Sequence, residues 1–386
     1  MRRLKAILLI LLLPLCGCMH AKTLDAYAYV LNIGVEKGTD MPYLVTLLVS
    51  VPGDGTESTK VQNKVVTAQA RTLSEAVITL NSAYPSRLSF SRASLLVLSE
   101  DLVRTGEQTA FLDLSFGKSD LWQNLRVVVA NGSVREILEG WLSESDPSLR
   151  KIKTAVGDLS IQAGLCADIG FSAYREAVQG KYGDAILAYA GVNAYELKPD
   201  LLGDGAYPYT GGALLIDSLL KTSTAGSAVF DGDRMVGVLD GQHTMAVLMV
   251  IDAFQRGELV LSLPDGQPLA VTLYRMRRPK IRMRNGKATV DVFLEADPIE
   301  PLTVPADSES LRTWIETQVE VELQSVFRAL QSVNSDAMGF GRFASRAFHS
   351  IEEWEAYDWK ADYRRLSVAF SATVMLSHDP NDPSSE

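Results

Sequence analysis

The fold signal is strongest in the stretch Lys280-Ile281-Arg282-Met283-Arg284-Asn285-Gly286-Lys287-Ala288-Thr289-Val290-Asp291-Val292-Phe293-Leu294. On both sides of Asn285-Gly286, residues alternate in kind with the period of two that is typical of a β-strand. An Asn-Gly pair between two such runs favours a type I′ turn, in which both central residues have positive φ. The stretch therefore predicts a β-hairpin.

The segments downstream of this hairpin predict a long helix and a last strand. From Asp307 to Gln331, apolar residues recur at steps of three or four, as on an amphipathic helix: Leu311, Ile315, Val319, Leu323, Phe327 and Leu330. Strict alternation returns from Leu366 to Leu376 and predicts a strand. The polar tail 379–386 is expected to be disordered.

The segments just upstream predict further strands around one helix. A second hairpin is expected over 228–239, where Asp231-Gly232-Asp233 supplies the turn. A helix is expected over 242–255, and strands over 258–263 and 270–276.

The N-terminal third mixes both kinds of element. Strands are expected over 24–35, 43–51, 64–71, 94–99 and 125–130, and helices over 72–83, 100–106, 109–116 and 133–142. Thr72 followed by Glu75 predicts a capping box at the start of the first of these helices. Strands with helices interspersed predict an α/β or α+β domain, and the polar segment 143–149 is its expected boundary.

The middle of the chain, 150–201, has the weakest pattern. Helical spacing predicts helices over 152–156, 159–166 and 171–178. The small residues Ala185, Ala188, Ala190 and Gly191 are interpreted as a surface for close helix packing. The Gly-, Pro- and Tyr-rich segment 200–210 is expected to be a linker.

The N-terminus predicts export and a lipid anchor. Arg2, Arg3 and Lys5 precede an apolar run over 6–15, which is the plan of a secretory signal. This run is about half of the roughly 20 residues that a membrane-spanning helix needs. Leu15-Cys16-Gly17-Cys18 resembles the lipobox of bacterial lipoproteins, which implies cleavage after Gly17 and diacylglyceryl attachment to the Cys18 sulfur. An ordinary secretory signal with an incidental cysteine is the alternative.

Charge and cysteine content exclude several classes of function. The chain has 37 Lys and Arg against 47 Asp and Glu, a net charge of −10, so nucleic acid is not an expected partner. Attraction to anionic lipid headgroups is not expected either, so lipid chains on Cys18 would have to hold the protein at a membrane. After Cys18 only Cys166 remains, which excludes an internal disulfide and a C-x-x-C metal or redox site.

The residues that usually carry chemistry are sparse. His20, His243, His349 and His378 lack metal-ligand spacing, so no metal is expected, and no phosphate- or dinucleotide-binding motif predicts a cofactor. His349 with Glu352 or Glu353 is interpreted as a surface helix rather than an acid–base pair, and Asp231-Gly232-Asp233 as a turn rather than part of a calcium loop. An aromatic-rich segment over 340–359 is interpreted as packing against the last strand rather than a ligand cage. No catalytic site is predicted, so the chain is not expected to be an enzyme.

Four blocks of sequence resemble the spore germination Ger(x)C family, the lipoprotein C subunits of nutrient germinant receptors. They are Ile33-Gly34-Val35-Glu36-Lys37; Arg87-Leu88-Ser89-Phe90-Ser91-Arg92 with the following 96–102; Gly226-Ser227-Ala228-Val229-Phe230 with 235–239; and Ser335-Asp336-Ala337-Met338-Gly339-Phe340-Gly341 with Trp354 and Trp359. With the lipobox they follow the family order along nearly the whole chain. The family-motif residues Asp336, Gly339, Phe340, Gly341, Trp354 and Trp359 are expected to be structural.

The resemblance implies an α+β (mixed α/β) fold of three packed domains with mostly antiparallel sheets and flanking helices. The expected division is a signal peptide (1–17), an N-terminal α/β domain (18–145), a middle helical or small domain (146–205) and a C-terminal α/β domain (206–378). The resemblance also implies a non-catalytic subunit, tethered to the outer face of the spore inner membrane, in complex with integral-membrane A-type and B-type subunits.

Two other classes of function remain open at this stage. A solute-binding lipoprotein of a transporter would need a cleft between two similar lobes with converging polar groups, and no repeated βαβ pattern indicates such lobes. A cell-wall hydrolase would need paired carboxylates at a cleft, and a single sequence does not locate such pairs.

Overall fold

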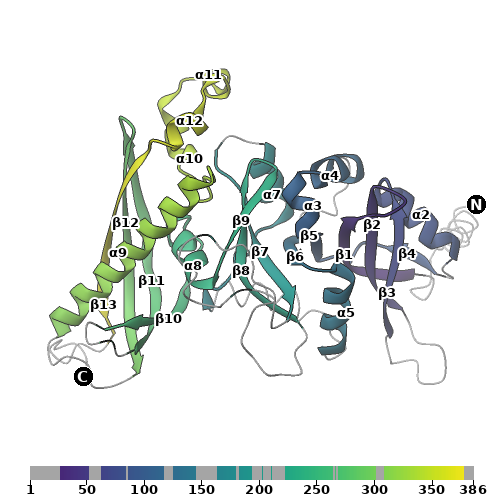
Figure 1. Ribbon diagram of the computed structural model, residues 1–386, viewed down its shortest axis with the longest axis horizontal. Coiled ribbons are helices and arrows are strands. Elements are labelled where there is room, and N and C mark those ends of the chain that lie inside the picture. The colour runs from purple at the N-terminus through teal and green to yellow at the C-terminus, as the bar shows by residue number, and fades with distance from the viewer. Residues whose placement is uncertain are drawn as a thin grey trace, which may run out of the picture.

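The structure is a computed structural model of the chain. It describes residues 27–51, 62–83, 86–116, 125–144, 163–179, 182–193, 202, 210, 222–263, 266, 268–300 and 308–377. In these residues the strands form two sheets, one with nine strands and one with four. Figure 1 shows the two sheets following one another along the longest axis of the molecule. We call each sheet with its helices a lobe.

The first lobe is built on the nine-stranded sheet, whose order is β3-β2-β1-β5-β6-β7-β8-β9, with β4 beside β1. The strands are β1 (Tyr27–Lys37), β2 (Tyr43–Val51), β3 (Gln62–Ala70), β4 (Arg87–Ser89), β5 (Leu95–Ser99), β6 (Arg126–Asn131), β7 (Ile186–Val192), β8 (Thr222–Asp231) and β9 (Arg234–Leu239). This sheet therefore includes strands from both sides of the expected boundaries after residues 145 and 205.

Helices cover both faces of this sheet. They are α2 (Leu73–Ala83), α3 (Glu100–Thr105), α4 (Gln108–Phe116), α5 (Val134–Glu144) and α7 (Phe171–Gln179). Alternate residues of β5 separate the two cores, because Leu96 and Leu98 pack with residues of α2, α3, α4 and α7, whereas Leu95 and Val97 pack with α5. This pattern explains why the central strands read as continuous apolar runs rather than alternating ones.

Strand β7 corrects the sequence interpretation. Ala188, Ala190 and Gly191 were expected to pack helices closely, but they lie in a strand that is parallel to β6 and antiparallel to β8. Ala188 and Ala190 are fully buried beneath α5. Small side chains fit there because helix and sheet approach closely, so the expected close packing against a helix occurs on the face of a strand.

The second lobe places one long helix on a four-stranded sheet of order β10-β11-β12-β13. The strands are β10 (Arg256–Ser262), β11 (Pro268–Arg284), β12 (Lys287–Glu300) and β13 (Ser367–Leu376), and the helices are α8 (Gly241–Val250), α9 (Ser308–Ser332), α10 (Gly341–Ala344), α11 (Ile351–Ala356) and α12 (Trp359–Tyr363). The predicted hairpin turns at Asn285 and Gly286, which have φ of 52° and 69° as the Asn-Gly pair requires. The apolar stripe of α9 is buried as predicted.

Glutamates on α9 protect the free edge of this sheet. β13 is an edge strand, and its Ala372 and Val374 N–H groups donate to the carboxylates of Glu320 and Glu316, each at 2.9 Å. An edge strand with unpaired N–H groups invites pairing with another chain. The side chains of α9 therefore close part of this edge.

The fold as a whole is α+β with mixed sheets. Of the strand pairs in the described residues, six are antiparallel and five are parallel. The predicted cap of α2 forms, since Thr72 Oγ1 accepts from the Glu75 N–H at 3.2 Å, but the Glu75 carboxylate accepts from Arg71 N rather than from Thr72. Within the described residues no helix is long and apolar enough to cross a membrane.

Candidate functional site

The motif 335–341 folds around one buried carboxylate, that of Asp336, whose side chain is fully shielded from solvent. Its two oxygens accept hydrogen bonds from Phe340 N at 2.8 Å, Gly341 N at 2.7 Å and the Trp359 indole Nε1 at 2.9 Å. Gly339 has a φ of 71°, a left-handed conformation that a residue with a side chain adopts at a cost. The sequence pattern Asp-x-x-Gly-Phe-Gly thus forms a turn whose backbone N–H groups bind the side chain of its first residue.

Burial changes the protonation of this carboxyl group. It raises the pKa of Asp336 to about 7, while the three N–H donors lower the pKa and the nearby carboxylate of Asp184 raises it further. Tyr363, whose hydroxyl donates to Ser335 O at 2.6 Å, has a pKa well above its ordinary value, also because of burial.

The same motif joins the second lobe to the first. Asp336 N donates to Asp184 Oδ2 at 2.5 Å, and Asp184 N donates back to Asp336 O at 3.0 Å. Asp184 Oδ1 also accepts from Gly232 N, in the turn between β8 and β9, at 2.9 Å. One aspartate, two residues before the start of β7, therefore joins the motif to the β8–β9 turn.

Lys360 neutralises the acidic groups at this junction. Its ammonium donates to Asp184, to Asp231 Oδ1 at 2.7 Å and to Asn334 O at 2.8 Å. The Asp184 side chain is only 3% exposed and that of Lys360 is 32% exposed. A buried carboxylate needs such a partner, because an unpaired buried charge is strongly destabilising.

The aromatic segment packs as core, in agreement with the sequence interpretation. Trp354 and Trp359 are 2% and 4% exposed and belong to the cluster that includes Val368 and Val374 of the last strand. The Trp354 ring lies parallel to that of Tyr182 from the first lobe, with centroids 5.9 Å apart. The aromatic segment therefore supports the junction between the lobes.

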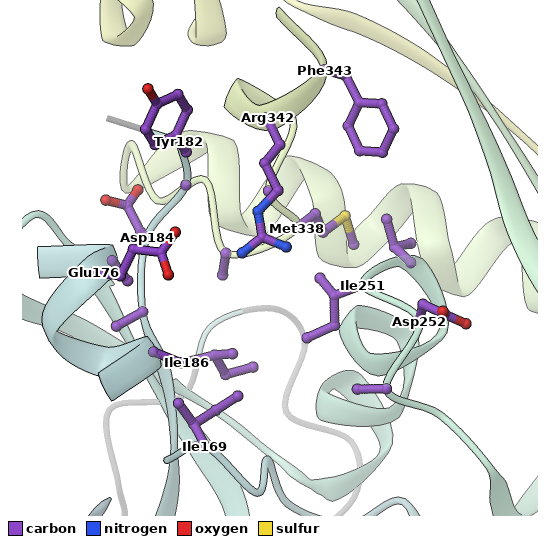
Figure 2. Close-up of a pocket in the computed structure, with 18 of the residues that line it drawn as sticks. Ile169, Glu176, Tyr182, Asp184, Ile186, Ile251, Asp252, Met338, Arg342 and Phe343 are labelled. Carbon is purple, nitrogen blue, oxygen red and sulfur yellow. The ribbon is translucent and has the colours of Figure 1, made fainter. Parts of the chain in front are cut away.

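A cavity of about 610 Å³ lies beside this junction, between the lobes. Figure 2 shows the Arg342 side chain reaching into it from the second lobe, opposite Asp184 and Glu176 of the first. Asp252 at its rim is paired with Arg275 at 2.6 Å and Arg278 at 3.1 Å. Glu176 and Arg342 form no ion pair with another described residue.

Several residues singled out in the sequence do not contribute to this site. Cys18 and the lipobox residues Leu15, Cys16 and Gly17 lie outside the described residues. His349 donates its backbone N–H to Glu353 at 3.0 Å, as part of the cap of α11. In the part of the chain that the structure describes, no three or more His, Cys, Asp or Glu side chains are placed to hold a metal ion.

Sequence reasoning missed Asp184 and Lys360. Asp184 lies in the region with the weakest pattern, and Lys360 was not singled out beside Trp359. Their contacts with each other span 176 positions of the chain, so no local pattern could reveal them. Asp231 was interpreted only as a turn residue, which is correct, but its second role is to bind Lys360.

Comparisons with known proteins match both halves of the chain. Residues 20–189 match the family model described as the spore germination protein N-terminal domain, and residues 225–379 match that of spore germination B3/GerAC like, C-terminal. The chain is 21% identical to the putative spore germination protein YfkR of Bacillus subtilis, covering 93% of this chain and 92% of that protein. The crystal structure of the GerBC protein has the same fold, with a TM-score of 0.51 and 14% identity over 93% of this chain and all of that one.

Proposed function

Because the chain belongs to the spore germination Ger(x)C family, we propose that it is a lipid-anchored, non-catalytic subunit of a nutrient germinant receptor. The observation that carries this proposal is the pair of family matches, which cover residues 20–189 and 225–379 and begin two positions after the lipobox cysteine. In this role the protein sits on the outer face of the spore inner membrane and assembles with integral-membrane A-type and B-type subunits.

The sequence before Tyr27 supports the lipid anchor, in which acyl chains would hold the protein at the membrane. Each buried CH₂ of an acyl chain contributes about 0.8 kcal/mol, and stable anchoring takes two signals, such as two chains. A diacylglyceryl group on Cys18 supplies two chains on one thiol. The described residues contain no helix that is long and apolar enough to cross a membrane.

The test is Cys18→Ala in the spore. We expect this variant to leave the membrane fraction and the response to nutrients to fall, because the thiol that carries the lipid is gone. Cys16→Ala is the matched control, since it removes a neighbouring cysteine that carries no lipid in this proposal. A Cys18→Ala protein that stays in the membrane fraction while the spores germinate normally would contradict the anchor.

Assembly with the two membrane subunits is tested separately. We expect the chain to co-purify with A-type and B-type subunits after mild detergent extraction. Recovery of the lipidated chain without either subunit would separate anchoring from receptor assembly and contradict the second part of the proposal.

One observation favours a second candidate, a solute-binding lipoprotein. The inter-lobe cavity has a size typical of small-molecule sites and contains Glu176 and Arg342, charges of opposite sign that suit a zwitterionic ligand. The lobes are unlike each other, with nine and four strands, so the paired similar lobes of that class are missing from the described residues. Calorimetric titration of amino acids into the purified chain distinguishes the candidates: heat that disappears in Arg342→Ala would favour solute binding.

A further inference from the structure

The protein contains a strongly basic segment, although its net charge is negative. Between Arg275 and Lys287 there are seven cationic residues and no acidic one, in a chain whose overall charge is −10. The seven are Arg275, Arg277, Arg278, Lys280, Arg282, Arg284 and Lys287. All lie on β11 or at the start of β12, in the hairpin of the second lobe.

The alternation of β11 sends most of these charges to the outer face of the sheet. Ile281 and Met283 pack against the core, so Lys280, Arg282 and Arg284 point the other way and are exposed. Helix α8 contacts β11, β12 and α9, helix α9 contacts β13, and the core that they form lies on the inner face. Helices α8 and α9 therefore do not cover the outer face.

The acidic groups of this face lie along β12: Asp291 is the one nearer the turn, and Glu295 and Asp297 alternate onto the same face farther from it. Asp291 pairs with Arg282 at 3.1 Å. Arg277 lies over the Phe293 ring at 3.6 Å and Lys280 at 5.4 Å, and Arg277 forms no ion pair with another described residue. Lys280, Arg284 and Lys287 form no ion pair with another described residue.

The neighbouring strand β13 presents a neutral surface beside these cations. In register beside Lys287, Thr289, Asp291 and Phe293 are Ser367, Ala369, Ser371 and Thr373 of β13, which are small and uncharged. Bulky anchors such as Trp and Tyr, which dominate most protein–protein interfaces, are lacking among these β13 residues. A row of cations instead favours electrostatic binding to an extended polyanionic surface.

We propose that this basic ridge, made of Arg277, Lys280, Arg282, Arg284 and Lys287, binds the anionic headgroups of a phospholipid bilayer. The inference rests on the proposed membrane location. Figure 1 shows β11 and β12 toward the opposite end of the longest axis from β1 to β4. A chain anchored before β1 and attracted at the β11–β12 hairpin lies along the bilayer rather than standing away from it.

The test uses the mature chain, residues 18–386 with Cys18→Ala, so that neither the leader 1–17 nor an acyl chain contributes to binding. It is mixed with vesicles of phosphatidylcholine alone or of equal parts phosphatidylcholine and phosphatidylglycerol, and the bound fraction is measured by sedimentation. We expect binding only to the anionic vesicles, weakened by added salt because salt screens surface charges.

The decisive variant adds Lys280→Gln, Arg284→Gln and Lys287→Gln. We expect its binding constant to fall more than tenfold, since each Lys or Arg near an anionic surface contributes roughly fivefold. The matched control carries Arg135→Gln, Arg312→Gln and Arg328→Gln, three exposed arginines on α5 and α9. It has the same net charge, and we expect it to bind nearly as well as the parent. Circular dichroism of each variant checks that it is folded.

The proposal is overturned by no binding to the anionic vesicles, by equal binding to neutral ones, or by equal losses in the two triple variants. Unchanged vesicle binding together with lost co-purification of a membrane subunit would assign the ridge to a protein partner, which also overturns it. Mass spectrometry of Cys18 in the native chain reports on the anchor alone, so failure of the proposed function is distinguished from failure of this inference.

Discussion

Asp336 makes the stability of the protein depend on pH. Burial raises the pKa of its carboxyl group to about 7, whereas an aspartate in an unfolded chain titrates near about 4. Between these values the folded state holds a proton that the unfolded state has released. The stabilisation from this group is therefore complete below about pH 4 and is lost as pH rises through about 7, with a slope of up to about 1.4 kcal/mol per pH unit.

We expect Asp336→Asn to remove most of that slope and to lower the free energy of unfolding by about 1–3 kcal/mol at acidic pH, because an amide offers one acceptor oxygen to three N–H donors. Urea unfolding between about pH 5 and pH 8 measures both effects. Asp358→Asn is the control, since Asp358 is an exposed cap of α12 that asparagine also fills. Equal pH dependence in the parent and the Asp336 variant would contradict the assignment.

The residues of the junction were predictable only in part. The family resemblance predicts a structural role for Asp336, Gly339, Phe340, Gly341, Trp354 and Trp359, and that role stays a prediction. In the structure these residues lie at or near the buried carboxylate or in the aromatic core. The resemblance did not identify Asp184, because a lone aspartate before a strand has no periodicity or spacing that marks it. Long-range polar contacts of this kind depend on the tertiary fold, which a local pattern does not contain.

At the scale of elements, β1 and α5 approach too closely for any side chain at Gly34. A Cβ there would lie 2.4 Å from Val134 Cγ1 and 3.3 Å from Thr46 Cβ. We expect Gly34→Ala to destabilise the protein by about 1–3 kcal/mol through overpacking. Chemical denaturation of the purified variant measures this loss.

A second substitution tests the cause. In Gly34→Ala combined with Val134→Ala, the clashing methyl group is removed. The double variant should therefore lose less free energy of unfolding than the two single variants lose together. Additive losses would mean that the strain at Gly34 comes from elsewhere. Val134→Ala alone supplies the reference, since it only removes buried methyl groups.

Elements were predictable where local signals agreed with the fold. The Asn285-Gly286 hairpin has alternation on both sides and a turn that only a few dipeptides favour, and it forms as predicted. β7 failed because a strand buried on both faces has no alternation, and its alanines carry no strand preference. What makes β7 a strand is its pairing with β6 and β8, and those partners are distant in sequence.

At the scale of the whole molecule, α8 connects the two lobes. All ten of its residues are buried, and its core cluster includes Ile186, Val229 and Leu239 of the first sheet together with strands and helices of the second lobe. A helix surrounded by both lobes shares its stability with both. The two lobes should therefore lose protection together when α8 is weakened.

The cap of α8 offers a mild way to weaken it. The buried Asp240 side chain accepts from His243 N at 2.8 Å and lies 3.0 Å from His243 Nδ1, so Asp240→Ala removes the N-cap and this second contact, at a cost of about 1–3 kcal/mol. We expect amide hydrogen exchange, followed by mass spectrometry, to speed up by a similar factor in peptides from β6 and from β12. Asp240→Asn keeps an acceptor at the cap and should leave both rates closer to the parent. Faster exchange confined to β12 would show that the lobes unfold as separate units, and α8 would then belong to the second lobe alone.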